Sequence, residues 1–245
     1  MVEDLIPLTF NYQTSRSGHN LLEKIVEKRC EHAKIIDYGL PLNVPLKLAR
    51  TPETRWLLQG ELKAIKDGHI YEEVESENST YRGYYNQYGK EEGVGILIWN
   101  DGTKFSGEYK GGHPNGVIKA EYAHGNICCG MCKDYQQNGY NTYQFKSGNT
   151  YTGQFKNGKR DSYGIARYPD GGTYHGQLNE DKREGYGIEK YPDNNEYDGQ
   201  WENNNRSGEG VYTYAKAGII QRQLWKDGKK VKVLETLEGL SLIHI

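Results

Sequence analysis

From Tyr81 onward the chain repeats itself about every 23 residues, and this period limits the folds that it can adopt. Each unit opens with an aromatic residue or a cysteine, and a glycine follows two positions later. A closing aromatic residue lies near the end of the unit. The units begin at Tyr81, Phe105, Cys128, Tyr151, Tyr174 and Tyr197. A fixed period of this size is typical of arrays in which each unit packs on the next, and such arrays mainly present surface.

The unit from 151 to 173 shows the local structure to expect. Tyr151, Gly153 and Phe155 alternate along the chain, so on a strand they share one face. Asn157-Gly158 is a typical hairpin turn, and it separates this strand from a returning one. Each unit is therefore predicted to be a β-hairpin. The glycines leave bare backbone, across which we expect aromatic rings from neighbouring strands to lie.

A tandem run of such hairpins predicts an all-β fold, an elongated single-layer antiparallel meander. The second face of the sheet is also partly apolar, because residues such as Tyr140, Ile165 and Tyr186 fall on it. A single layer cannot hide both faces. We therefore expect one face to be covered by an N-terminal helix, by a second copy of the chain or by a partner protein.

The segments outside the array have different patterns. Asn20 is a good helix cap, and Leu22, Ile25 and Val26 recur at helical spacing in an otherwise charged segment. Apolar residues of the C-terminal tail also lie near helical spacing. The chain is accordingly divided into an irregular N-terminal arm (1–18), an amphipathic helix (19–39), an extended Pro-containing connector (40–57), the repeat array with degenerate first and last units (58–232) and a C-terminal tail (233–245).

Composition argues against several classes of protein. The 31 basic and 33 acidic side chains give a net charge of −2, so no nucleic-acid surface is expected. No apolar run is long enough to predict a membrane-spanning segment. No serine or cysteine nucleophile comes with a recognisable motif, and the histidines occupy unrelated repeat positions. We therefore expect neither an enzyme nor a bound cofactor.

Three of the four cysteines crowd at Cys128, Cys129 and Cys132. Cys129 and Cys132 have the spacing of half a zinc site, but residues three apart on a strand point to opposite faces. Cys128 and Cys132 also occupy the two aromatic positions of their unit. We therefore expect these two thiols to replace aromatic residues, with no metal bound. The cysteines predict no disulfide framework, as in a reducing compartment.

Three units carry the repeat motif most fully, and they read YTGQFKNGKRDSYGIARYPDGG, YHGQLNEDKREGYGIEKYPDNN and YDGQWENNNRSGEGVYTYAKAG. With this pattern the chain resembles MORN-repeat proteins over roughly residues 58–230. The resemblance implies an elongated sheet of hairpins used for assembly, as in scaffold, junctional, ciliary and cytoskeletal proteins. The pattern is broken by Ile118, Asn141 and Ser162, which stand where other units have a return-strand glycine. The middle of the array is therefore expected to bend or twist differently.

These observations predict a non-catalytic scaffold that holds other protein subunits in a large assembly. The resemblance favours an axonemal or cytoskeletal complex inside the cell, with a mitochondrial or other organellar complex as an alternative. A peripheral phospholipid-binding adaptor is a second alternative, because Lys159/Arg160 and Lys182/Arg183 fall at hairpin tips. Membrane contact is then at most peripheral, and self-association of the chain stays open.

The binding surface is expected to be aromatic, since tyrosine and tryptophan dominate interface hot spots. The apolar stripe of the N-terminal helix is expected to dock against protein. The candidate protein-binding residues are Tyr85, Trp99, Tyr109, Tyr151, Phe155, Tyr168, Tyr174, Tyr191, Tyr197, Trp201, Tyr214, Leu22, Ile25 and Val26.

Overall fold

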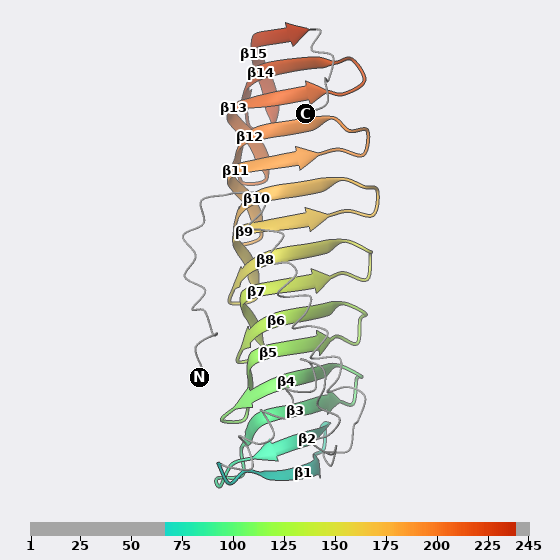
Figure 1. The fold of residues 1–245 in the computed structure, drawn as a ribbon, viewed down its shortest axis with the longest axis vertical. Coiled ribbons are helices and arrows are strands. Elements are labelled where there is room, and N and C mark those ends of the chain that lie inside the picture. Colours follow the sequence, from blue (N-terminus) through green and yellow to red (C-terminus); the bar gives the residue numbers. More distant parts are fainter. Residues whose placement is uncertain (1–66, 239–245) are drawn as a thin grey trace, which may run out of the picture.

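The computed structural model describes residues 67–238, which form one antiparallel sheet of fifteen strands (Figure 1). Strand order in the sheet follows the sequence, and the strands stack along the long axis of the molecule. The described residues contain no helix. The predicted all-β meander is therefore confirmed. The arm (1–18), the helix (19–39) and the connector (40–57) lie outside the described residues.

Shorter outgoing strands alternate with longer returning strands through most of the sheet. The strands are β1 (Ile70–Glu75), β2 (Ser79–Tyr85), β3 (Glu91–Trp99), β4 (Lys104–Lys110), β5 (His113–Glu121), β6 (Ile127–Lys133), β7 (Gln136–Gln144), β8 (Thr150–Lys156), β9 (Lys159–Arg167), β10 (Thr173–Asn179), β11 (Lys182–Lys190), β12 (Glu196–Glu202), β13 (Asn205–Tyr214), β14 (Ile219–Lys226) and β15 (Lys229–Glu238).

Tight turns and bulges give the sheet its shape. At the tip between β8 and β9, Asn157 and Gly158 have positive φ values of 50° and 78°, as a two-residue hairpin turn requires. The register of this pair shifts between Gly153 and Phe155, and most other outgoing–returning pairs carry an equivalent bulge. A bulge bends its strand and increases the local twist. The strands accordingly curve, and the sheet forms a long trough (Figure 1).

The last strand extends the sheet beyond residue 232, the predicted end of the array. β15 runs to Glu238, where it pairs with Ile219 at the start of β14. Two bulges interrupt the register between these strands, so the apolar residues of β15 do not alternate simply in the sequence. Their spacing resembles that of a helix, but pairing with β14 determines the structure of residues 233–238.

Candidate interaction surface

One face of the sheet, here called the aromatic face, carries the opening residue of each unit. Tyr174 in β10 lies over Gly176 on its own strand and over Gly187, which pairs with Gly176 from β11. The Tyr174 hydroxyl donates to the main-chain oxygen of Gln177 at 2.9 Å. A Cβ added at Gly176 would lie 2.6 Å from that hydroxyl and 2.5 Å from the Cα of Gly187. Bare backbone on both strands is therefore required beneath the ring.

The covering ring comes from the strand of the first glycine, so the expectation of a ring from a neighbouring strand holds for the second glycine alone. The reason is that a side chain on a strand leans along the strand direction, which brings the tyrosine hydroxyl to the carbonyl three residues on. The same arrangement recurs with Tyr81 over Gly83 and Gly95, Tyr151 over Gly153 and Gly164, and Tyr197 over Gly199 and Gly210. We call the units that begin at Tyr81, Tyr151, Tyr174 and Tyr197 the regular units.

The two irregular units, which begin at Phe105 and Cys128, fill this space differently. Asn141 stands opposite Gly130, and its Nδ2 donates to the main-chain oxygen of Met131 at 2.9 Å. In the preceding unit Ile118 stands opposite the corresponding glycine. Gly130 has a φ of 148°, a positive value that the paired glycines of the regular units do not have. The backbone of the middle units therefore differs from that of the regular units, as expected.

The rings of successive regular units contact one another edge to face. Tyr174 lies 5.5 Å from Trp201 of the next unit, measured between ring centroids. Trp201 in turn lies 5.4 Å from Tyr197, and Tyr197 lies 5.6 Å from Trp225. Such pairs contribute about 0.5–1.5 kcal/mol each beyond the area that they bury. These rings belong to a cluster of buried residues that extends from Tyr151 to Trp225, beside a second cluster over residues 81–132.

Arginines at 23-residue intervals cover this series of rings. The guanidinium of Arg183 lies 4.1 Å from the ring centroid of Trp201, and Arg206 covers Trp225 in the same way at 4.5 Å. Arg160 covers its own unit's tyrosine and donates to Asp181 of the next hairpin tip at 2.8 Å. The arginines therefore join neighbouring hairpins. The phospholipid-binding alternative requires basic side chains at the hairpin tips that are free to bind lipid. These arginines instead bind groups of the protein itself.

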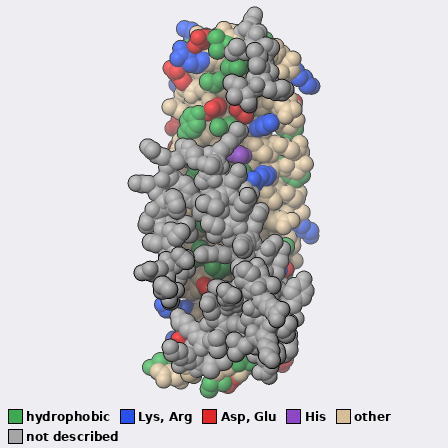
Figure 2. Space-filling model, viewed as in Figure 1, with side chains coloured by type: hydrophobic (Ala, Val, Ile, Leu, Met, Phe, Trp, Pro, Cys, Tyr) green, Lys and Arg blue, Asp and Glu red, His purple; other side chains and the backbone are tan. Residues whose placement is uncertain are grey.

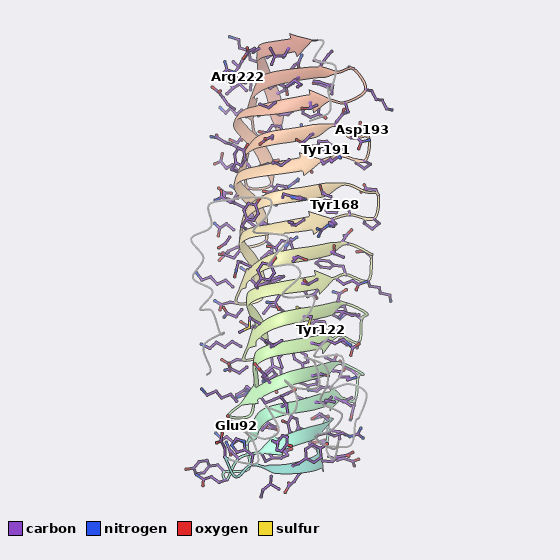
Figure 3. All side chains as sticks on the ribbon, viewed as in Figure 1. Glu92, Tyr122, Tyr168, Tyr191, Asp193 and Arg222 are labelled. Carbon is purple, nitrogen blue, oxygen red and sulfur yellow. The ribbon has the colours of Figure 1, made fainter. Side chains whose placement is uncertain are left out.

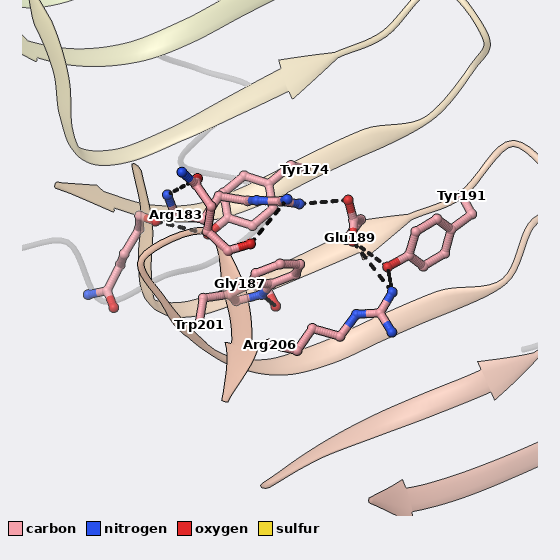
Figure 4. A network of polar contacts seen from close by, with 9 residues as sticks. Tyr174, Arg183, Gly187, Glu189, Tyr191, Trp201 and Arg206 are labelled. Atoms are coloured by element: carbon pink, nitrogen blue, oxygen red, sulfur yellow. Dashed lines mark hydrogen bonds and ion pairs between the residues drawn. The ribbon is translucent and has the colours of Figure 1, made fainter. Parts of the chain in front are cut away.

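Glu189 lies between two of these arginines on the aromatic face (Figure 4). Its carboxylate accepts a hydrogen bond from Arg183 Nη1 at 2.6 Å and another from the Tyr191 hydroxyl. Arg206 donates to the oxygen of Tyr191, and its Nη2 lies 3.9 Å from the carboxylate. Burial and the neighbouring Glu189 raise the pKa of Tyr191 above its ordinary value. This network fixes the ring of Tyr191 at the start of its turn.

The closing aromatic residues lie along the edge of the sheet where the longer turns are, and we call them the aromatic row. The members are Trp99, Tyr122, Phe145, Tyr168, Tyr191 and Tyr214. Figure 3 shows Tyr122, Tyr168 and Tyr191 on this one edge, at successive heights along the molecule. Tyr168 is exposed and the other members are half-buried. The row is therefore partly accessible to solvent, and Tyr168 is its exposed member.

One turn geometry presents most members of the row. The N–H of Tyr168 donates to the main-chain oxygen of Gly172 at 2.9 Å, and the N–H of Gly171 donates back to Tyr168 at 3.0 Å. Equivalent pairs of bonds form at Trp99, Tyr122, Phe145 and Tyr191. Since the backbone of each of these turns is fixed by its own hydrogen bonds, binding a partner along the row would order few main-chain groups.

The MORN repeat family model matches residues 81–104, 151–173, 174–196 and 197–218. These segments are the regular units, in which a tyrosine covers two paired glycines. The chain contains four MORN repeats. The two irregular units fall between the first and second matched segments. No curated protein matches the chain at a significant level.

The MORN array separates the predicted binding residues into two groups. The structure buries Tyr109, Tyr151, Phe155, Tyr174, Tyr197 and Trp201. These six side chains form the core of the aromatic face, because each packs on the glycines or on a neighbouring ring, and they present no surface to a partner. Trp99, Tyr168, Tyr191 and Tyr214 belong to the aromatic row, and Tyr85 is half-buried against the core. Leu22, Ile25 and Val26 lie outside the described residues.

Two features of the repeat array were missing from the predicted site. Tyr122 and Phe145 complete the aromatic row, and their shared position at the close of each unit was the available signal. The cation–π contacts of Arg160, Arg183 and Arg206 were also missing, although these residues occupy one position in three consecutive repeats. Recurrence at the repeat period, rather than charge alone, distinguishes them from ordinary surface cations.

The cysteines of the middle units follow the prediction in part. Cys128 and Cys132 are buried in the ring core and are free thiols, so they replace aromatic residues as expected. Burial raises the pKa of Cys132 to about 12. Cys129 lies on the other face and takes part in a disulfide bond, which a fully reduced set of thiols would not include. Within residues 67–238 no group of three or more His, Cys, Asp and Glu side chains is arranged to hold a metal ion.

Some charged side chains at the described hairpin tips have polar partners on a neighbouring tip. Lys159 pairs with Glu180 at 3.2 Å, and Lys182 donates to Asn203 at 3.1 Å. Figure 2 shows basic and acidic groups interspersed over the end of the molecule that carries the last strands. No helix in the described part of the chain is long and apolar enough to cross a membrane. At the last hairpin tip, by contrast, Lys226, Lys229 and Lys230 surround one acidic residue, Asp227.

Proposed function

We propose that this protein is a non-catalytic scaffold subunit that binds other protein subunits along the aromatic row. MORN repeats indicate a repeat protein used for protein or membrane interaction. The aromatic row is the observation that favours a protein over a membrane as the partner. Its partly accessible rings recur at the repeat spacing along one edge. Tyrosine and tryptophan side chains dominate protein–protein hot spots.

The polar groups of the aromatic face support a structural rather than a catalytic role. Arg183, Glu189 and Arg206 hydrogen-bond or stack within the face, where they hold neighbouring repeats together. The interactions of these three side chains thus position the neighbouring aromatic rings. A catalytic centre would instead direct a titratable group with a perturbed pKa toward a substrate cavity.

The proposed setting is a large axonemal or cytoskeletal complex within the cell, in a cilium or the cytoskeleton. An elongated rod with evenly spaced contact points suits a complex in which several partners are aligned along one subunit. A mitochondrial or other organellar complex would use the same row, so the setting is decided by the partners that are recovered.

The test is native co-purification of the full chain with cross-linking mass spectrometry. We expect the same protein subunits to be recovered reproducibly, with cross-links to Lys104, Lys146 and Lys216 near the turns of the aromatic row. The variant Trp99→Ser/Tyr168→Ser should lose these partners. The matched control Tyr88→Ser/Tyr186→Ser changes two exposed rings outside the row and should retain them.

Two outcomes would refute the proposal. The first is loss of partners in the control and their retention in the row variant. The second is recovery of the chain only with vesicles that contain anionic phospholipid, with release as salt rises. Release by salt is the behaviour of an electrostatic lipid adaptor, because screening weakens attraction between exposed charges.

A further inference from the structure

The opposite face of the sheet differs in exposure between equivalent repeat positions. Tyr140 in β7 is 7% exposed, whereas Tyr186, the same residue type two repeats later, is 54% exposed. Ile165 in β9 is 3% exposed, and Val211, again two repeats later, is 38% exposed. Ile165 and Val211 both belong to regular units, so the altered backbone of the middle units does not explain their difference, which calls for a cover over the earlier part of this face.

The covered stretch has definite limits. Ser106, Cys129, Thr152 and Ile165 are all buried on the opposite face, and they lie on strands from β4 to β9. The face is open again at Tyr186 in β11. The described residues form a single sheet, so no described strand lies across this stretch. The described strands therefore do not account for the burial of this stretch.

A disulfide bond on this stretch narrows the choice of occupant. Cys129 is disulfide-bonded, whereas Cys128 and Cys132 are free thiols. The sequence contains four cysteines, and the fourth is Cys30. Within one chain, Cys30 is thus the available partner for the thiol of Cys129.

Cys30 belongs to the predicted amphipathic helix over residues 19–39. It follows Val26 by four residues and precedes Ala33 by three, so in a helix it falls on the apolar stripe. That stripe is too narrow to be the core of a separate domain and too apolar to remain in water. A disulfide from the stripe to Cys129 would turn it toward the sheet.

We propose that residues 19–39 dock through their apolar stripe on the opposite face over β4–β9, where a disulfide between Cys30 and Cys129 holds them. The dimensions agree. A helix of this size is about 30 Å long at 1.5 Å per residue. Crossing from β4 to β9 covers five strand spacings, or about 24 Å. The helix then lies along the length of the rod and leaves the aromatic row free.

Formation of this bond needs an electron acceptor. The thiols of Cys30 and Cys129 each lose one hydrogen, and a small-molecule disulfide such as oxidised glutathione accepts both and becomes two thiols. The apolar contact brings the cysteines together, and exchange with the small disulfide forms the bond between them. Under reducing conditions the contact lacks this covalent link.

Peptide mapping of the full chain tests the disulfide. After incubation with oxidised glutathione, alkylation and tryptic digestion without reductant, we expect the peptide 30–34 linked to the peptide 120–133. Fragmentation should place the link at Cys129, with Cys128 and Cys132 alkylated. The link should disappear in Cys129→Ser and remain in the matched control Cys128→Ser. Complete alkylation of Cys30 and Cys129, or a disulfide-linked dimer in place of the internal link, would overturn the proposal.

Footprinting of tyrosine side chains by hydroxyl radicals tests the docking itself. In the wild-type chain, labelling of Tyr140 should be several-fold lower than labelling of Tyr186. In Ile25→Asp/Val26→Asp it should rise to approach that of Tyr186, while circular dichroism shows the hairpin array intact. The control Glu27→Ala/Glu31→Ala, on the charged side of the helix, should keep Tyr140 protected. Equal labelling of Tyr140 in the Asp variant and the wild type contradicts the docking.

Discussion

The regular unit that begins at Tyr174 and the irregular unit that begins at Cys128 differ in what fills the space above the first glycine. In the regular unit a tyrosine from the outgoing strand covers Gly176 and Gly187. In the irregular unit the opening residue is a cysteine, and Asn141 from the returning strand occupies the space. One sheet thus accommodates two packing arrangements that exclude each other at any one unit.

The comparison shows which residues must change together. A tyrosine ring at the opening position requires glycine on both strands, since a Cβ on either one would collide with it. A side chain on the returning strand requires a smaller opening residue or one without the hydroxyl. The opening residue and the residue opposite its glycine are therefore a coupled pair, and stability should depend on the pair rather than on either member.

The largest effect is expected from filling the covered space in a regular unit. Gly176→Val should destabilise the sheet by about 3 kcal/mol or more, because its side chain would displace the ring of Tyr174 and push against Gly187. Ser147→Val, at an exposed turn position, should change stability by no more than about 0.5 kcal/mol. Urea denaturation of both variants measures this. Equal losses would show that the ring does not depend on bare backbone.

The irregular unit should respond to loss of a hydrogen bond. Asn141→Ala should cost about 2 kcal/mol, because the buried side-chain amide that donates to the main-chain oxygen of Met131 is removed and a small void is left. Asn138→Ala, which removes a long bond to a neighbouring tip, is the matched control and should cost little. If the two variants unfold at the same urea concentration, Asn141 does not fill the role that the ring has elsewhere.

High pH should weaken the regular units through their buried phenols. Burial raises the pKa of Tyr151 well above its ordinary value of 10. The stabilisation is complete below pH 10 and is lost as pH rises, because the unfolded chain releases the phenolic proton while the folded chain keeps it. Each such tyrosine contributes a fall of about 1.4 kcal/mol per pH unit above pH 10.

The pH effect can be assigned to single residues. Above pH 10, Tyr151→Phe should reduce the slope of stability against pH by the amount that corresponds to about one proton. At neutral pH the variant is less stable, because the hydrogen bond to Gln154 is lost. Tyr88→Phe changes a highly exposed ring and should leave the decline unaltered. Urea denaturation curves measured at several pH values between about 8 and 11 give the change of stability with pH for the two variants. Identical slopes in wild type and Tyr151→Phe count against ionisation of this buried phenol.

The smallest effect is expected from the arginines. Arg183→Gln should cost about 1 kcal/mol, because the guanidinium that covers Trp201 and binds Glu189 is lost. Lys182→Gln, one residue away on the exposed side of the strand, should be nearly neutral. Thermal denaturation compares the two. The irregular unit that begins at Cys128 has Gln137 at the corresponding position. Arg183→Gln therefore also measures how much stability that unit forgoes by having no arginine there.

The hairpins were predictable because their signals are local. The alternation of Tyr151, Gly153 and Phe155 and the turn at Asn157-Gly158 specify a hairpin without reference to the rest of the chain. The bulged end of β15 was not predictable in this way. Its apolar residues do not alternate simply in the sequence, because two bulges interrupt the register with β14. Pairing with β14, rather than the sequence pattern, therefore determines that these residues form a strand.

The candidate surface was predictable only in part, because burial depends on curvature. Tyr197 and Tyr168 are both tyrosines at recurring positions, yet one is wholly buried and the other is exposed. The bulges that curve the strands enclose the opening ring and leave the closing ring at the edge. Periodicity identifies both positions. It does not indicate which of them the curved sheet encloses.

The most direct test of the account is the exchange of one packing arrangement for the other in the unit that begins at Cys128. Cys128→Tyr alone should destabilise the sheet by about 2 kcal/mol or more, since Asn141 occupies the space the ring needs. Adding Asn141→Gly should recover at least half of that loss in urea denaturation, because the ring then covers paired glycines. If the stability of the double variant equals the sum of the two single effects, the ring and the glycine are not coupled, and this result would contradict the central claim.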